Sequence, residues 1–526
     1  MNRYGFILLI LLIFAGCVPA PEDTDMQITV IADGRQRVWV YDQQISVQQF
    51  LEQIGITLGE LDRVNPPEYT QIQDGMTITV RRVEERVDCE DEILPYQTET
   101  VAIEGLDPGA QQLGQPGVNG IQQVCYRVIV EDGEDQQRIE VRRVPVEAPQ
   151  NEVIYVGVDT SSITPVPIAG TLAYLSNGNA WVMRGSSSTK RPITNTGALD
   201  GRVFSLSVDG RQLLYSQTYN GEEEAVYFNT LWAILNTSAD QPEPLQLNAL
   251  NNILYGEWVP GQAATFSYSA GEARDAAPGW QAFNDLWIMR IDESSGNLIA
   301  PRNLVESSSG GTYGWWGTTF RWSPDGSALA WSRADSVGLV DLETGEFQPL
   351  LEFAVYATYQ DWVWQPPLAW SPDNLIIATT VHGAPFGTEQ PENSPIFNVA
   401  VTPIDGTFQA DVVERAGMWA IPQFSSYSGE GDATRGYLAY LQARNPLNSV
   451  NDVYDLVVAD RDGSNGRVIF PEPSEPGITS PEFVWGPDGL EVAVIYQGNL
   501  WVVDVVSGRA HQLTVDGGAS SPRWTR

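Results

Sequence analysis

The stretch Thr319-Phe-Arg-Trp-Ser-Pro-Asp-Gly-Ser-Ala-Leu-Ala-Trp-Ser332 decides the fold of the larger part of this chain. Its centre, Ser323-Pro-Asp-Gly326, predicts a type I turn, with proline at the second position and glycine at the fourth. Apolar residues on both sides of the turn predict two antiparallel strands. Two further apolar segments, 337–341 and 347–351, complete a unit of four strands.

The same frame recurs along the chain at a period of about 50 residues, which is typical of propellers. Clear copies stand at 206–210, 258–261, 370–373 and 485–489, and a degraded copy stands at 424–436. Each copy is followed by an apolar strand, a run such as Leu286-Trp-Ile-Met, a polar hairpin and a fourth strand. The repeats therefore predict a β-propeller with four strands in each blade.

The two ends of the repeat region indicate how the ring closes. Residues 172–194 supply a second, third and fourth strand without a first, and Ser521-Pro-Arg-Trp524 supplies a first strand with nothing after it. Sharing one blade between the two ends pairs strand edges that would otherwise stay open. We expect seven blades over residues 170–526, closed by the C-terminal strand. Six or eight remain alternatives because the 424–436 copy is weak.

The Trp322-Ser-Pro-Asp-Gly326 frame resembles that of TolB-type, WD40-like propellers, and the resemblance extends over residues 170–526. It implies a propeller fold and a scaffold role in an envelope complex.

Residues 26–85 predict a small ββαβ domain. Period-two spacing of Ile28 with Val30 and of Val38 with Val40 predicts two strands, residues 47–54 carry apolar residues at helical spacing, and 76–80 predicts a closing strand. The segments Gly55-Ile-Thr-Leu-Gly, Leu61-Asp-Arg-Val and Asp74-Gly-Met-Thr-Ile-Thr-Val resemble the ubiquitin-like domain of resuscitation-promoting factors.

In that family the ubiquitin-like domain commonly precedes a G5 domain, and residues 86–158 resemble one. The resemblance rests on Glu92-Ile-Leu-Pro-Tyr and on the spacing of Gly109, Gly117 and Gly120. Glycines at these positions suit a positive φ or a close approach of strands in a thin sheet. The resemblance implies cell-wall adhesion and N-acetylglucosamine binding. A Ser-, Thr- and Pro-containing linker, 159–169, separates this domain from the propeller.

The N-terminus predicts export. Phe6–Phe14 is an apolar run of nine residues, too short to span a bilayer, which needs about 20. Ala15-Gly16-Cys17 resembles the lipobox of bacterial lipoproteins, which implies a signal peptide over 1–16, an acylated Cys17 that anchors the chain to the cell membrane, and a tether over 17–25. The alternative is an ordinary cleaved signal with an incidental cysteine.

The other two cysteines, Cys89 and Cys125, form an even pair in an exported chain, so we expect a disulfide between them, with two buried free thiols as the alternative. Cys89 is expected to precede the first strand of its domain, and Cys125 to lie in a middle strand, 122–130. Such a bond would help most where a thin β-fold buries little apolar surface.

The charge excludes one class of partner. With 67 acidic and 29 basic residues the net charge is −38, so the chain repels phosphate backbones and we expect no nucleic-acid binding. We expect no cofactor and no metal site. The only histidines, His382 and His511, lie far apart, and the oxygen-rich segment 460–466 lacks the glutamate of a calcium loop and is interpreted as a turn.

The positions of six long segments indicate where ligands bind. In an antiparallel blade the second-to-third loops and the blade-to-blade connections share one face. The long segments fall there, at 219–229, 270–284, 307–318, 353–366, 383–394 and 444–452. Aromatic rings stack on sugars or capture apolar side chains of a protein. The candidate ligand-binding residues are Trp315, Trp316, Tyr313, Trp280, Tyr359, Trp362, Trp364 and Tyr227. The alternative is that these rings pack inside their own loops.

Together these features predict a mostly β, non-enzymatic envelope lipoprotein whose propeller binds a cell-wall glycan or an envelope protein. The rival is a hydrolase or lyase that acts on extracellular polysaccharide through Asp and Glu side chains on the same face, since the many acidic residues offer carboxylate pairs. A third interpretation is a scaffold in an envelope complex.

Overall fold

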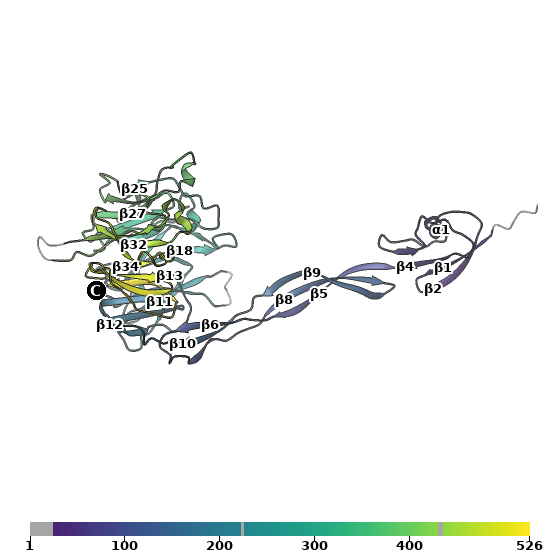
Figure 1. Ribbon diagram of the computed structural model, residues 1–526, viewed down its shortest axis with the longest axis horizontal. Helices are drawn as coiled ribbons and strands as arrows, with labels where there is room; N and C mark the ends of the chain where they lie inside the picture. The colour runs from purple at the N-terminus through teal and green to yellow at the C-terminus, as the bar shows by residue number, and fades with distance from the viewer. Residues whose placement is uncertain (1–24, 222–225, 430–434, 526) are drawn as a thin grey trace, which may run out of the picture. The chain divides into compact units, whose positions relative to one another are not determined.

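The computed structural model describes residues 25–221, 226–429 and 435–525, which are nearly all β-structure (Figure 1). These residues form two compact units. The first contains the chain up to Glu99 together with Gln115–Glu152, and the second contains Thr100–Gly114 together with Val153–Arg526. The expected signal peptide, Cys17 and nearly all of the expected tether lie outside the described residues.

The ubiquitin-like domain is a four-stranded sheet in the order β2–β1–β4–β3 with one helix packed on it. Its elements are β1 (Met26–Ala32), β2 (Arg35–Tyr41), α1 (Val47–Gln53), β3 (Arg63–Asn65) and β4 (Thr77–Arg81). The helix begins at a capping box in which Ser46 and Gln49 each bond the other's backbone N–H. Ile28 and Val30 meet Phe50, Leu51 and Ile78 in a fully buried core.

The expected strand at Val38 and Val40 forms, but those two side chains face away from the core and are 59% and 62% exposed. Trp39 and Tyr41 pack inward instead, and Trp39 pairs with Ile28 of β1. Alternation predicts that a strand has two faces but does not say which face is buried, and here the larger aromatic side chains occupy the inner one.

The G5 segment contains two sheets. One is a long ribbon in the order β5–β8–β9, built from β5 (Val83–Leu94), β8 (Gly120–Glu131) and β9 (Glu134–Glu147), and the other has the order β6–β10–β7, built from β6 (Thr98–Ile103), β7 (Gln111–Gln115) and β10 (Glu152–Gly157). The close approach expected at two glycines is confirmed. A Cβ on Gly117 would lie 2.4 Å from the Tyr96 ring, and one on Gly120 would lie 2.3 Å from the Glu147 carbonyl oxygen.

The disulfide between Cys89 and Cys125 is confirmed. The two residues are directly paired across β5 and β8, with 4.0 Å between their Cα atoms. Cys89 therefore lies inside the first strand of the domain rather than before it. The strand begins earlier than expected, at Val83. The ribbon buries little of either face, so this polar, acidic stretch carries no apolar alternation by which a strand is predicted.

The second unit contains seven sheets that form the blades of the propeller (Figure 1). Blade 1 comprises β13 (Leu199–Leu206), β14 (Leu213–Thr218), β15 (Asn229–Ile234) and β16 (Leu245–Asn251). Blade 2 comprises β17 (Ile253–Trp258), β18 (Thr265–Ala273), β20 (Leu286–Ile291) and β21 (Leu298–Val305), with β19 (Trp280–Ala282) beside β18. Blade 3 comprises β22 (Thr319–Trp322), β23 (Leu329–Arg333), β24 (Ser336–Val340) and β25 (Phe347–Glu352).

The remaining blades complete the ring. Blade 4 comprises β26 (Ala369–Trp370), β27 (Ile376–His382), β28 (Phe397–Pro403) and β29 (Ala410–Val413). Blade 5, the degraded copy, comprises β30 (Gln423–Phe424), β31 (Tyr437–Ala443), β32 (Tyr454–Asp460) and β33 (Arg467–Phe470). Blade 6 comprises β34 (Phe483–Trp485), β35 (Glu491–Tyr496), β36 (Asn499–Asp504) and β37 (Ala510–Gln512). Blade 7 comprises β38 (Ala519–Thr525), β11 (Pro167–Ser176) and β12 (Asn179–Pro192).

Blade 7 joins the two ends of the domain as expected, because β38 pairs with β11 and places Leu172 opposite Trp524. Its expected fourth strand at 192–194 is absent as a strand. Ile193 donates one backbone hydrogen bond to Ala180 (2.8 Å), but Thr194 bonds through its side chain instead of extending a ladder.

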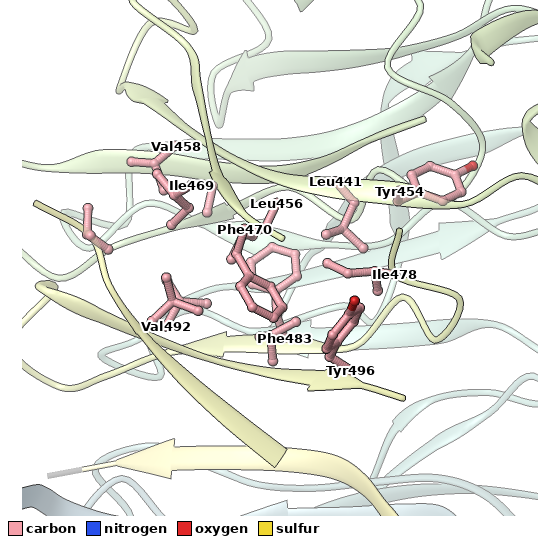
Figure 2. Close-up of a cluster of buried hydrophobic side chains, with 14 of the residues drawn as sticks. Leu441, Tyr454, Leu456, Val458, Ile469, Phe470, Ile478, Phe483, Val492 and Tyr496 are labelled. Carbon is pink, nitrogen blue, oxygen red and sulfur yellow. The ribbon is translucent and has the colours of Figure 1, made fainter. Parts of the chain in front are cut away.

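Neighbouring blades are held together at their first strands. Trp322, Trp370 and Trp485 each donate an indole hydrogen bond of 2.9–3.0 Å to the adjacent blade, and Arg523 of β38 donates to the Phe204 carbonyl of blade 1 (2.9 Å). Apolar side chains fill the space between blades. Figure 2 shows this layer between blades 5 and 6, where Leu456, Phe470, Phe483 and Tyr496 point toward one another.

The strand order confirms that the long segments share one face. Every one of them either joins a second strand to a third or joins one blade to the next. We call this side of the disc the long-connection face. The short first-to-second and third-to-fourth turns lie at the opposite face.

Candidate functional site

The connection between blades 2 and 3 is held on the long-connection face by a buried amide. Asn284, 1% exposed, donates to the Gly314 carbonyl oxygen (2.9 Å) and accepts from the Thr318 hydroxyl (2.9 Å). Gly314 has no room for a side chain, since a Cβ would lie 1.8 Å from the Ser309 carbonyl oxygen. The segment ends in a short 3-10 turn, η1 (Gly314–Trp316), preceded by Tyr313 in the left-handed region with φ of 56°.

The next connection, between blades 3 and 4, is ordered by its own polar side chains. The Thr358 hydroxyl donates to the Trp362 carbonyl oxygen (2.7 Å), and the Trp362 indole donates to Gln360 (3.1 Å). The Tyr359 hydroxyl donates to Asn393 (2.9 Å) in the neighbouring loop. Tyr359 adopts a left-handed φ of 54° and its side chain is 83% exposed.

Gln365 joins the two connections. Its amide nitrogen donates to the Gly317 carbonyl oxygen (2.6 Å), and its amide oxygen accepts from the Thr319 hydroxyl (3.0 Å). The two segments are therefore fixed side by side, although about 45 residues of chain and a whole blade separate them.

Between these connections lies a pocket of about 290 Å³, hereafter the aromatic pocket. Five of its lining residues are aromatic, three are polar or acidic, and Ala357 and Val363 are apolar. The lining residues are Tyr313, Trp316, Tyr356, Ala357, Thr358, Tyr359, Gln360, Asp361, Trp362 and Val363. Burial raises the pKa of Tyr356, which keeps its hydroxyl protonated. Rings that offer a flat apolar face beside hydroxyl, amide and carboxylate groups suit a ligand with both apolar and hydroxyl-rich surface.

Four of the eight candidate residues, Tyr313, Trp316, Tyr359 and Trp362, thus come together in one pocket. Two others, Tyr227 and Trp280, lie elsewhere on the same face. Trp280 is 6.2 Å from Phe228 between ring centroids and has the Arg202 guanidinium 4.2 Å from its centroid. Tyr227 contacts Tyr219 at 5.4 Å. Trp315 is 40% exposed but does not line the aromatic pocket.

Trp364 requires a correction, because its side chain is 1% exposed. It packs edge-on against Phe397 at 5.0 Å, and its indole donates to the Met418 carbonyl oxygen (3.3 Å). A ring buried on all sides offers no face to a ligand, so Trp364 supports the loop from beneath. The polar pocket residues Thr358, Gln360 and Asp361 were not predicted, because only the fold brings them beside Tyr313 and Trp316.

His382, 4% exposed, supports the pocket from below. Its two ring nitrogens lie 2.7 Å from the Ala354 carbonyl oxygen and 2.9 Å from the Ser394 carbonyl oxygen, so it links the blade 3–4 connection to the loop after β27. The pocket residue Tyr356 packs edge-on against the same ring at 5.4 Å.

Within 25–221, 226–429 and 435–525, no helix is long and apolar enough to cross a membrane. Over the same residues no group of three or more His, Cys, Asp or Glu side chains is arranged to hold a metal ion.

Comparisons with known proteins identify the N-terminal domains. Residues 85–159 match the G5 domain, and residues 28–68 match the G5-linked ubiquitin-like domain. The chain is 28% identical over 153 residues to resuscitation-promoting factor RpfB of Mycolicibacterium smegmatis, a match that covers 29% of this chain and 40% of that protein's length.

Two solved structures are similar to part of this chain. A TolB structure from Agrobacterium tumefaciens is 14% identical, with 61% of this chain and 92% of that chain covered and a TM-score of 0.33. The periplasmic gluconolactonase PpgL of Pseudomonas aeruginosa is 15% identical, with 68% and 99% covered and a TM-score of 0.41. The assignment of a propeller therefore rests on the strand order and closure described above, and the family models match the ubiquitin-like and G5 segments at 28–68 and 85–159.

Proposed function

We propose that this chain is a non-enzymatic binding protein of the bacterial envelope, anchored by an acylated Cys17, whose aromatic pocket binds a cell-wall glycan. The observation that carries the proposal is the pocket itself, in which five aromatic side chains from two connections surround one hollow. The G5 and ubiquitin-like domains, shared with a resuscitation-promoting factor, support an extracellular location and a role as spacer or wall contact.

A glycan is favoured over a flat protein surface because the pocket is concave and combines rings with hydrogen-bonding groups. Pyranose rings present C–H groups on one face and hydroxyls around the edge, which matches Trp316 and Trp362 beside Thr358 and Asp361. The net charge of −38 also disfavours anionic polymers such as nucleic acid. An envelope protein is the alternative ligand, and it would be captured through the same rings.

The hydrolase alternative is less favoured at this pocket. Glycoside hydrolysis commonly uses two carboxylates about 5 to 9.5 Å apart. Asp361 is the only acid among the described residues that line the pocket. Binding without turnover is therefore the expected behaviour.

The test is retention on insoluble cell-wall glycan. Removing an aromatic anchor from a binding site costs about 2 kcal/mol, or roughly 30-fold in affinity, so the double variant Tyr359→Ala, Trp362→Ala should lose retention. Tyr69→Ala is the matched control, since Tyr69 and Tyr359 are both 83% exposed. Unchanged retention of the double variant would refute the pocket as the site, and release of reducing ends by the wild type would favour the hydrolase.

The anchor is tested separately. Durable membrane attachment needs two or more acyl chains, and the proposal places them on Cys17. Cys17→Ser removes the acylated residue, so the protein should move from the membrane fraction to the soluble fraction. Membrane partitioning identical to that of the wild type would contradict lipidation.

A further inference from the structure

A second hollow, of about 430 Å³, lies between the outer strands of blades 5 and 6, and we call it the interblade groove. Ile469, Phe470, Tyr496 and Trp501 form its floor, and it is lined also by Glu472, Glu475, Pro476, Gln497, Gly508, Arg509 and Ala510. The groove is open because the last strand of blade 6, β37, spans only Ala510–Gln512 and leaves part of Trp501 uncovered.

Three aromatic rings make the floor continuous. Ring centroids are 4.9 Å apart for Phe470 and Tyr496, 5.8 Å for Phe470 and Trp501, and 5.9 Å for Tyr496 and Trp501. Figure 2 shows Phe470 and Tyr496 close together in the interblade core. The Tyr496 hydroxyl donates to the Pro476 carbonyl oxygen (3.0 Å), which ties the floor to the rim, whereas the Trp501 indole N–H has no partner among the described residues.

The rim carries opposite charges at its two ends. Glu472 and Glu475 lie in the connection that follows β33, at the long-connection face, and a backbone hydrogen bond from Glu475 to Glu472 (2.9 Å) places them in one turn. Arg509 lies in the β36–β37 turn, at the opposite face. The ion pairs formed by the described residues include none of these three side chains.

We propose that the interblade groove binds an extended dipolar ligand, with an alkylammonium group at Glu472 and Glu475, an apolar stem across Phe470 and Trp501, and a carboxylate at Arg509. The paired carboxylates and the aromatic faces both attract an organic cation. The guanidinium suits a carboxylate, which it can hold through two parallel hydrogen bonds. A lysine-like or diamino-acid residue with a free main-chain carboxylate has this pattern of charge, because its side chain ends in an ammonium group.

The site is separate from the aromatic pocket, so it stands or falls independently of the glycan proposal. Each element of the ligand is required for a different reason. The cation is attracted to two exposed carboxylates, the methylene stem removes apolar floor from water, and the carboxylate gives direction along the groove.

The probe is ε-aminocaproate, titrated into the purified protein by calorimetry. We expect saturable binding at one site, and at least tenfold weaker binding of caproate, which lacks the ammonium, and of n-hexylamine, which lacks the carboxylate. The double variant Glu472→Gln, Glu475→Gln should lose the preference for ε-aminocaproate over caproate. Arg509→Gln should lose the preference over n-hexylamine.

Glu343→Gln is the control, because Glu343 is an exposed acid in the β24–β25 turn of blade 3 and does not line the groove. It should bind the probe as the wild type does. The proposal is overturned if ε-aminocaproate shows no saturable binding, or if its binding is the same in the wild type and in both groove variants.

Discussion

Lys190, the only lysine of the chain, provides the sharpest test of how residues 100–114 join the propeller. Its ammonium forms an ion pair with Glu104 just after β6, and the two side chains are only 11% and 5% exposed. Lys190 also donates to the Leu513 carbonyl oxygen (2.7 Å), and Glu104 accepts from the Val515 backbone N–H (2.8 Å). One buried pair thus ties residues 100–114 to the blade that closes the ring.

Replacing Lys190 with Met keeps the length of the side chain and removes its charge. The Glu104 carboxylate is then left buried with one hydrogen bond, and breaking a buried ion pair in this way costs about 3–5 kcal/mol. Glu104→Met should cost a similar amount, because it leaves the Lys190 ammonium and the Val515 N–H without their carboxylate partner. The double variant should lose clearly less than the sum of the two, since neither charge is left alone.

The assay is urea unfolding of the four proteins, followed by tryptophan fluorescence, which reports mainly on the propeller because Trp39 is the only tryptophan before Trp181. The second readout is the rate at which an amine reagent labels Lys190 in the native protein. We expect slow labelling in the wild type and fast labelling in Glu104→Met. The reasoning is refuted if Lys190→Met lies within about 0.5 kcal/mol of the wild type, as exposed substitutions do.

Three further predictions follow from other parts of the molecule. Replacing Cys89 and Cys125 by Ser opens a loop with a sequence separation of 36 residues. The chain-entropy model gives a loss of about 4 kcal/mol in the free energy of unfolding of the G5 ribbon. Limited proteolysis near 83–147 should therefore accelerate, and an unchanged rate would contradict this. Burial raises the pKa of Asp62, but hydrogen bonds from Gly59, Val83 and Arg82 outweigh it and hold that pKa below its ordinary value. The stability from Asp62 is therefore present above the unfolded pKa of about 3.9 and is lost as the pH falls through the lower folded value. Asp62→Asn should flatten the acid-unfolding curve of the ubiquitin-like domain, measured through the Trp39 indole NMR signal, and an unaltered curve would count against it. His382→Leu removes the ring between the Ala354 and Ser394 carbonyl oxygens and leaves at least one of them without its donor, at about 1–3 kcal/mol. It should weaken glycan retention as well as lower stability, and full retention would show that the pocket does not depend on His382.

The propeller was predictable because its signals are local. A Ser-Pro-Asp-Gly turn favours a hairpin through local chemistry. The lack of a first strand before residue 172, and of further strands after Trp524, indicated the shared blade. The Leu172 to Trp524 pairing confirms that reasoning, and the four strands of blade 5 form although its 424–436 segment lacks a Ser-Pro-Asp-Gly turn.

Burial of individual residues was less predictable. Trp362 and Trp364 lie two positions apart in one connection, yet one lines the aromatic pocket and the other packs beneath it. Val38 and Val40 form the expected strand with the opposite face inward. In both cases the burial of a side chain depends on which residues from elsewhere in the chain pack against it, and alternation alone does not contain that information.

Pairings over long distances were not visible in the sequence. The Lys190–Glu104 pair spans 86 positions and joins two regions that differ in composition. The Gln365 bridge to Gly317 likewise becomes meaningful only when blade 3 brings the two connections together. Such contacts can be predicted only once the order of the strands and blades is known.

We propose that the aromatic pocket on the long-connection face binds the ligand of this protein. A crystal structure of the protein soaked with the cell-wall saccharide that it retains best tests this most directly. Sugar density is expected between the Tyr313–Trp316 and Tyr359–Trp362 pairs, with one ring stacked on a tryptophan. Sugar density on the opposite face of the disc, with the aromatic pocket empty, would contradict it.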